Sequence, residues 1–139
     1  NLFAGTLGGG VFLSTNSGAN WSSAGLDGFG IDHIAICNNN VFASTYGTNG
    51  TVYLSSDNGT TWSVSDLGLT EKTVLDFEVY ETNIFASTLN FVFLSSNNGV
   101  SWTAVDEGLT AFYYMSLGVN ESYLFAGTMG FKCMAPPII

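Results

Sequence analysis

The stretch Ser55-Ser-Asp-Asn-Gly-Thr-Thr-Trp62 decides the fold, because a close copy of it occurs twice more in the chain. It returns as Ser14-Thr-Asn-Ser-Gly-Ala-Asn-Trp21 and as Ser95-Ser-Asn-Asn-Gly-Val-Ser-Trp102, so that successive tryptophans stand 41 and 40 residues apart. A short polar run ending in glycine, between apolar segments, is typical of a tight β-hairpin. A hairpin that recurs at a fixed spacing indicates a protein built from repeated structural units.

Two further markers keep the same order in the repeats. A Phe-Ala-Gly/Ser-Thr segment precedes each hairpin and occurs a fourth time near the C-terminus, and a Gly-Leu pair follows each tryptophan. No stretch keeps a helical period over ten residues. The middle repeat divides into four short segments that we predict as strands: Ile31–Cys37, Val41–Tyr46, Val52–Ser56 and Thr61–Ser65. The sequence therefore predicts an all-β chain of four-stranded antiparallel units, the pattern of β-propeller blades.

The hairpin pattern Ser/Thr-x-Asp-x-Gly-x-x-Trp resembles the Asp-box, or BNR repeat, of sialidase-like and sortilin-like propellers. With the Phe-Ala-Gly/Ser-Thr segment before it, the chain looks most like the secreted bacterial Asp-box propellers, and xyloglucanases and photosystem assembly factors carry similar units. The resemblance covers residues 1 to about 130. It implies a propeller fold and an extracellular or periplasmic location. It implies no particular activity, because unrelated functions share these propellers.

Each conserved type of residue within the box has a structural role in a tight hairpin. The glycine adopts a positive φ without steric cost. The side-chain oxygen of Asp or Asn accepts backbone N–H groups across the turn, and Asn keeps this acceptor while losing only the charge. The tryptophan is expected to pack its ring beneath the hairpin. The predicted structural residues are Asn16, Gly18, Trp21, Asp57, Gly59, Trp62, Asn97, Gly99 and Trp102.

The charge balance excludes several classes of function. The formal net charge is −9, the only basic residues are Lys72 and Lys132, and the chain has no arginine. Binding to nucleic acid or to an anionic membrane surface depends on Lys and Arg, and no apolar run reaches the roughly 20 residues of a membrane span. We therefore expect neither nucleic acid nor membrane as a partner. The arginine cluster with which sialidases grip a substrate carboxylate is also missing.

Signatures of catalysis and of cofactor binding are sparse. His33 is the single histidine, there is no Gly-x-Ser-x-Gly elbow, and no second carboxylate beside Asp57 completes a calcium site. We therefore expect no catalytic residue, no metal and no cofactor. Eleven carboxylates leave an inverting glycosidase open, so the alternative interpretation is a fragment of a larger Asp-box glycoside hydrolase. Cys37 and Cys133 make no disulfide framework and are expected to be buried free thiols.

Aligning the repeats on their Phe-Ala segments identifies a candidate binding position on the first strand of each unit. The alternate face of that strand carries His33, Ala35, Asp76 and Glu78. Such positions would line an axial channel or its mouth, so we predict that His33, Asp76 and Glu78 contact a ligand; a solvated channel wall is the alternative. The opposite face is expected to be buried and carries Ile34, Ile36, Phe77, Val79, Leu117 and Val119.

Strand counting predicts an unfinished ring of about three and a half blades. The blade pieces 1–26, 27–69, 70–109 and 110–139 supply three, four, four and three strands, whereas propellers have about 4–8 blades. Either two copies close a ring of six, seven or eight blades as a homodimer, or the chain is part of a longer propeller. The tail Met134–Ile139 contains two prolines and is expected to be an edge, a linker or a subunit contact.

These observations favour a non-catalytic binding or structural propeller module. Such a module would assemble with itself into a ring and offer a ring face or the channel to a glycan or protein ligand.

Overall fold

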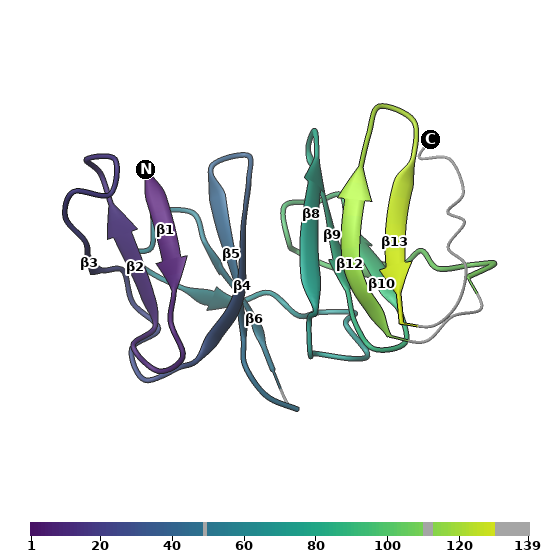
Figure 1. Ribbon diagram of the computed structural model, residues 1–139, viewed down its shortest axis with the longest axis horizontal. Coiled ribbons are helices and arrows are strands. Elements are labelled where there is room, and N and C mark those ends of the chain that lie inside the picture. Colours follow the sequence, from purple (N-terminus) through teal and green to yellow (C-terminus); the bar gives the residue numbers. More distant parts are fainter. Residues whose placement is uncertain (49, 110–112, 130–139) are drawn as a thin grey trace.

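The computed structural model describes residues 1–48, 50–109 and 113–129 (Figure 1). These residues form 13 β-strands and no helix, which confirms the all-β prediction for the described part of the chain. None of them belongs to a helix long and apolar enough to cross a membrane. The predicted fourteenth strand at Phe131–Met134 lies outside the described residues, together with Lys132, Cys133 and the proline-containing tail.

The 13 strands form four small antiparallel sheets that follow one another in chain order. Within each sheet, strands that are neighbours in sequence pair with each other, so the topology is a simple meander. The first sheet contains β1 (Leu2–Gly5), β2 (Val11–Ser14) and β3 (Ser22–Ser23). The second contains β4 (Ile31–Cys37), β5 (Asn40–Thr45), β6 (Val52–Ser55) and β7 (Ser63–Val64). The third contains β8 (Asp76–Tyr80), β9 (Asn83–Ser87), β10 (Val92–Ser95) and β11 (Thr103–Ala104), and the fourth contains β12 (Tyr114–Val119) and β13 (Leu124–Thr128).

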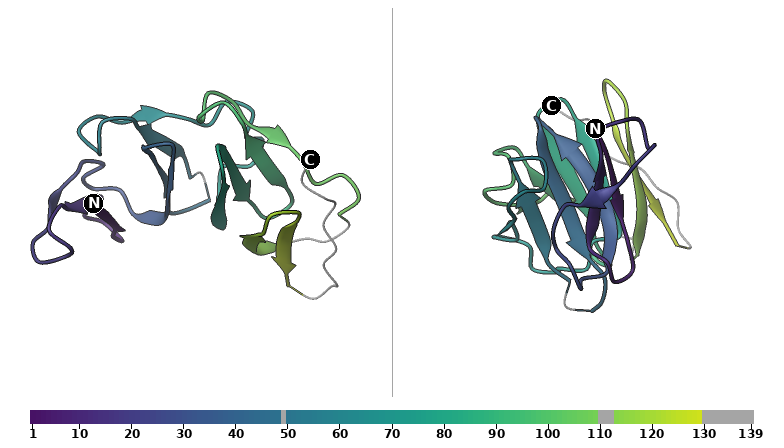
Figure 2. Two further views of the ribbon diagram at one scale, coloured as in Figure 1. Left: turned by 90° about the horizontal axis from the view of Figure 1, so that it is seen from above. Right: turned by 90° about the vertical axis from the view of Figure 1, so that its left-hand side faces the viewer.

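The four sheets succeed one another along an arc (Figure 2, left). In the second and third sheets the first strand lies on the concave side of the arc and the fourth strand on the convex side. Strand β8 contacts both β4 and β12, so these three first strands line the concave side together. The repeated hairpins join third to fourth strands and therefore lie toward the convex side.

The predicted strands of the middle repeat correspond closely to β4–β7, with one clear difference. Strand β4 has the predicted bounds Ile31–Cys37, whereas the last strand is only Ser63–Val64 and not Thr61–Ser65. The Thr61 N–H donates to the Asp57 side chain at 2.8 Å, so this residue belongs to the hairpin and not to the ladder. Turn bonding within the box therefore shortens the fourth strand.

The hydrophobic cores lie between successive sheets. The largest cluster joins Phe42 and Val52 of the second sheet to Phe77, Phe93 and Trp102 of the third. A second cluster lies between the first and second sheets, and a third between the third and fourth. A sheet inside the arc is thus covered on both faces. This explains why β5 is buried at every position from Val41 to Thr45, a continuous run instead of an alternating one.

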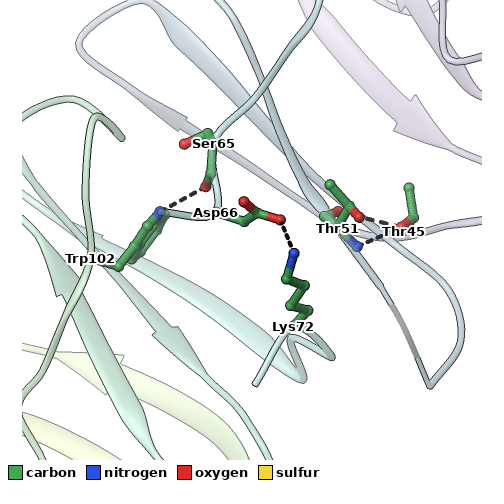
Figure 3. A network of polar contacts seen from close by, with 6 residues as sticks. All are labelled: Thr45, Thr51, Ser65, Asp66, Lys72 and Trp102. Atoms are coloured by element: carbon green, nitrogen blue, oxygen red, sulfur yellow. Dashed lines mark hydrogen bonds and ion pairs between the residues drawn. The ribbon is translucent and has the colours of Figure 1, made fainter. Parts of the chain in front are cut away.

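The threonine of the Phe-Ala-Gly/Ser-Thr segment closes the turn between the second and third strands. In the second sheet the Thr51 N–H donates to the Thr45 hydroxyl oxygen at 2.8 Å, and this hydroxyl in turn donates to the Thr51 carbonyl (Figure 3). Thr6 and Thr88 make the equivalent pair of bonds in the first and third sheets. A local hydroxyl-to-backbone contact therefore accounts for the threonine in each of these three copies.

Cys37 is a free thiol buried between the second and third sheets, as expected for this residue. Its Sγ atom lies 4.0 Å from the Glu81 carbonyl oxygen, and burial raises the pKa of the thiol. Cys37 is accordingly a small apolar core residue with little thiolate character.

Candidate functional site

The repeated hairpin is held together by two side chains, and the middle copy shows the arrangement completely. The Ser55 hydroxyl accepts the Gly59 N–H at 2.7 Å and donates to Asp57 Oδ1 at 2.8 Å. The Asp57 carboxylate then accepts both the N–H and the hydroxyl of Thr61, at 2.8 and 2.7 Å. Asn58 and Gly59 both have positive φ, of 58° and 84°, which places this backbone in the conformation of a tight hairpin.

The two Asn-containing hairpins keep the same bonds. Asn16 Oδ1 accepts the Asn20 N–H at 2.9 Å, and Asn97 Oδ1 accepts the Ser101 N–H at 3.0 Å. The serine two residues earlier donates to the Asn oxygen in both cases. The side-chain acceptor expected from the sequence is therefore present in all three hairpins, with or without a charge.

Asp57 differs from its Asn counterparts in one measurable respect, the dependence of its contribution on pH. The hydroxyl of Thr61, then its N–H, and then the Ser55 hydroxyl lower the pKa of Asp57 to about 2. An unfolded Asp titrates near 3.9. The stabilisation by this carboxylate is therefore fully present above about pH 4 and is lost as pH falls through about 2.

We expect the wild-type chain to lose stability relative to Asp57→Asn when urea unfolding is followed by circular dichroism from about pH 6 to about pH 2. The other carboxylates titrate in both proteins, so the difference between the two curves reports Asp57 alone. Asn97→Asp is the matched control and should introduce the same pH dependence into the third sheet. Parallel curves for the wild type and Asp57→Asn over this range would contradict the assigned hydrogen bonds.

The tryptophans of the hairpins reach the preceding sheet, so the expectation that each ring packs simply beneath its own hairpin is wrong. The Trp62 indole N–H donates to the Ala24 carbonyl at 2.7 Å, and the Trp102 N–H donates to the Ser65 carbonyl at 2.8 Å (Figure 3). Each acceptor comes directly after the last strand of the sheet before. The indole is the side chain long enough to span two sheets and still present a donor at its tip, which a ring beneath its own turn would leave unpaired.

Exposure of the three tryptophans follows their place in the arc. Trp102 is 3% exposed and stacks on Phe77 of its own sheet, with the edge of Phe42 from the second sheet against it. Trp62 is half-buried, and Trp21 of the first sheet is 44% exposed. Equivalent residues in the sequence therefore differ in burial because only two of the three hairpins lie against a preceding sheet.

The candidate ligand contacts lie on two strands of the concave side. Asp76 and Glu78 share one face of β8, since alternate residues of a strand point the same way, and His33 lies on β4. Burial, and then the charge of Asp76, raise the pKa of Glu78. Among the described residues, no hydrogen bond or ion pair joins the His33 side chain to either carboxylate. The structure thus brings the two acids together but gives no direct link to the histidine.

Asp76 also has a structural contact that the sequence did not suggest. Its Oδ2 atom accepts the Leu117 N–H of β12 at 2.7 Å, so one oxygen of this carboxylate holds the third sheet to the fourth. The residues that lie 41 positions apart in the chain are equivalent in successive repeats, which is why the contact could not be seen in either repeat alone. Of the three candidates, His33 and Glu78 have no side-chain partner of this kind.

The expected division of the first strand into a buried face and a channel face is wrong. Ala35, expected to face the channel, packs against the core between the second and third sheets, whereas its neighbour Ile34 packs between the first and second. Ile36, expected to be buried, is 49% exposed. A first strand lies between two other sheets, so both of its faces meet a core.

A further cluster of polar residues, centred on Glu71, was not predicted. Its carboxylate accepts the Thr88 hydroxyl and the Asn90 N–H, both at 3.0 Å, and also the Asn90 side-chain amide. In the same loop between the second and third sheets, Lys72 forms an ion pair with Asp66 at 2.7 Å (Figure 3). A hollow beside this loop is lined in part by Glu71 and Lys72, whose charged groups are both engaged within the chain. A single Glu or Lys in a loop carries no sequence signal for such partners.

Among residues 1–48, 50–109 and 113–129, no three His, Cys, Asp or Glu side chains are grouped closely enough to hold a metal ion. No protein-family model matches the sequence, and no curated protein sequence matches it either. The repeats and their contacts are therefore the basis for assigning a role to the chain.

Proposed function

We propose that the chain is a non-catalytic β-propeller module of the Asp-box type, whose four sheets are successive blades of a ring that a second copy completes. One observation carries this proposal: the same tryptophan-to-carbonyl contact joins the first sheet to the second and the second to the third. A contact repeated at each junction rotates each sheet in the same sense relative to the one before. Such a repetition leads to a closed ring when the rotation divides a full turn.

The order of strands within the sheets supports the interpretation as blades. In both four-stranded sheets the first strand lies on the concave side and the fourth on the convex side, as radial blades around an axis require (Figure 2). The cores lie between sheets, so that no sheet inside the arc buries both faces by itself. A repeat unit of this kind is stable only with neighbours on both sides.

The role as a binding or structural module follows from the side chains on offer. The whole chain has no arginine and one histidine, and one oxygen of Asp76 is engaged by a backbone N–H. A catalytic pair of acids would need both carboxylates free to meet a substrate. We place the ligand face on the concave side, at His33 and Glu78, with a glycan or a protein as the ligand class. The extracellular or periplasmic location rests on the sequence resemblance alone.

Light scattering coupled to size exclusion tests the proposal on the unmodified chain. We expect a molar mass near twice the chain mass of 14.7 kDa, independent of the loading concentration, because a closed ring has no free end faces left. A monomer, or a broad distribution of aggregates with open edges, would contradict self-assembly. That result would favour the alternative of a piece of a longer propeller, such as an Asp-box glycoside hydrolase.

A further inference from the structure

The contact between successive sheets has two halves, and both occur three times in the chain. The hairpin half contributes the indole N–H of the box tryptophan. The carbonyl half is the segment three to six residues after a tryptophan, and it contributes the acceptor: Ala24 for Trp62, and Ser65 for Trp102. By the same spacing, the third carbonyl half begins at Val105. Two hairpin halves and two carbonyl halves are thus paired inside the chain, which leaves one of each.

The unpaired hairpin half is in the first sheet and comprises residues 14–21. Trp21 is 44% exposed, although its own hairpin has the same hydrogen bonds as the other two. A Cβ atom at Gly59 would meet Ala24, and one at Gly99 would meet Phe42, in each case a residue of the preceding sheet. A Cβ atom at Gly18 would meet only Leu2 and Trp21 of its own sheet. This hairpin therefore has the shape of an interface without the partner.

The unpaired carbonyl half is in the third sheet and comprises residues 105–108. Gly25, Gly68 and Gly108 have nearly the same positive φ, of 88°, 94° and 86°. A Cβ atom at the first two would press on Trp62 or Trp102 of the next sheet, whereas nothing lies within 4 Å of one at Gly108. Ala24 and Ser65 are buried, but Val105 is half-buried. No described residue donates a hydrogen bond to the Val105 carbonyl.

We infer that the hairpin half of one copy docks on the carbonyl half of a second copy, with the Trp21 indole N–H donating to the partner's Val105 carbonyl. This contact rests on the proposed self-assembly and names the surface that produces it. The partner is a second copy because the two halves already fit each other twice within this chain. Each copy carries one half of each kind, so the association is head to tail, and two copies related by a two-fold axis make the contact twice.

The energetics of the inferred contact depend on Trp21. Tryptophan is the residue most often found to dominate the affinity of a protein interface, because it buries a large ring and presents one donor. An exposed indole next to a glycine turn costs little conformational entropy on docking, since the hairpin already has its bound form. We therefore expect Trp21→Ala to weaken self-association at least about thirty-fold, and Trp21→Phe, which keeps a ring but loses the donor, by a smaller factor.

Sedimentation velocity over a range of protein concentrations measures this effect on the full chain. Tyr46→Ala is the matched control, because Tyr46 is an exposed aromatic residue on a loop outside both halves, and it should leave association unchanged. Circular dichroism melts establish that each variant is folded. Gly108→Ala, on the other half, should also weaken association, because the added methyl group would stand where the hairpin of the second copy docks.

Mixing the two variants distinguishes a head-to-tail contact from any other dimer. In a mixed pair, Trp21 of the Gly108→Ala copy meets the intact carbonyl half of the Trp21→Ala copy, so one of the two contacts is wild-type. The mixture should therefore associate more tightly than either variant alone. A wild-type dimer that Trp21→Ala does not weaken, or a mixture no tighter than its components, would overturn the inferred contact and leave the proposed self-assembly standing. A wild-type chain that remains monomeric would overturn both.

Discussion

Replacing Trp102 with alanine is expected to lower the free energy of unfolding by about 3–5 kcal/mol, the range for truncating a buried aromatic residue. The Trp102 ring is 3% exposed and lies with its centroid 6.3 Å from those of both Phe42 and Phe77. Removing it opens a cavity between the second and third sheets. It also deprives the buried Ser65 carbonyl of its donor, a loss that adds to the cavity cost.

Urea unfolding monitored by circular dichroism measures this loss, and two further variants separate its causes. Trp102→Phe keeps an aromatic ring in the core but loses the N–H, so it should fall between the wild type and Trp102→Ala. Val100→Ala changes an exposed side chain of the same hairpin and should cost no more than about 0.5 kcal/mol. Equal losses for Trp102→Ala and Val100→Ala would mean that the tryptophan does not join the two sheets.

Substituting Gly68 with alanine is expected to cost about 3 kcal/mol or more. The φ of Gly68 is +94°, a conformation that costs an L-residue about 1–2 kcal/mol. In addition, the new Cβ atom would overlap the carbonyl oxygen of Trp102, which belongs to the next sheet. Because this oxygen is part of the backbone, no side-chain rotation relieves the overlap, and the two sheets must move apart. Overpacking of this kind costs about 1–3 kcal/mol more.

Gly28→Ala is the control for backbone strain, because Gly28 has a φ of +87° with open space where a Cβ atom would lie. This variant should show the conformational cost alone, about 1–2 kcal/mol. The difference between Gly68→Ala and Gly28→Ala in urea unfolding therefore measures the close approach of the second and third sheets. If the two variants lose the same stability, the sheets are not packed as closely as this contact requires.

The sequence determined everything that depends on short-range bonding. The repeat spacing, the hairpins and the four strand segments of the middle repeat could be predicted because their signals lie within a few residues of one another. The Asp57 carboxylate, for example, bonds only to Ser55 and to Thr61, four residues on. Turns of this kind form from local conformational preference, so the residue types alone indicate them.

The destination of each tryptophan, in contrast, was decided by the tertiary structure. Trp102 bonds to Ser65, 37 residues earlier, and Asp76 to Leu117, 41 residues later. Both distances are close to one repeat, so the partner is an equivalent segment of the neighbouring sheet. A pattern that is the same in every repeat cannot indicate which copies meet, nor that Trp21 has no preceding sheet among the described residues.

The two faces of the first strand were decided in the same way. Alternation along Ile31–Cys37 correctly predicted a strand, but it suggested one buried face, as in a sheet with one side open to water. Ile34 and Ala35 instead pack into two different cores, one on each side of the sheet. The sequence alone thus determined the units, their strands and their turns through local backbone and side-chain bonding. The order in which the units cover one another, and hence which equivalent residues are buried, followed only from stacking the sheets, because burial depends on neighbours a whole repeat away.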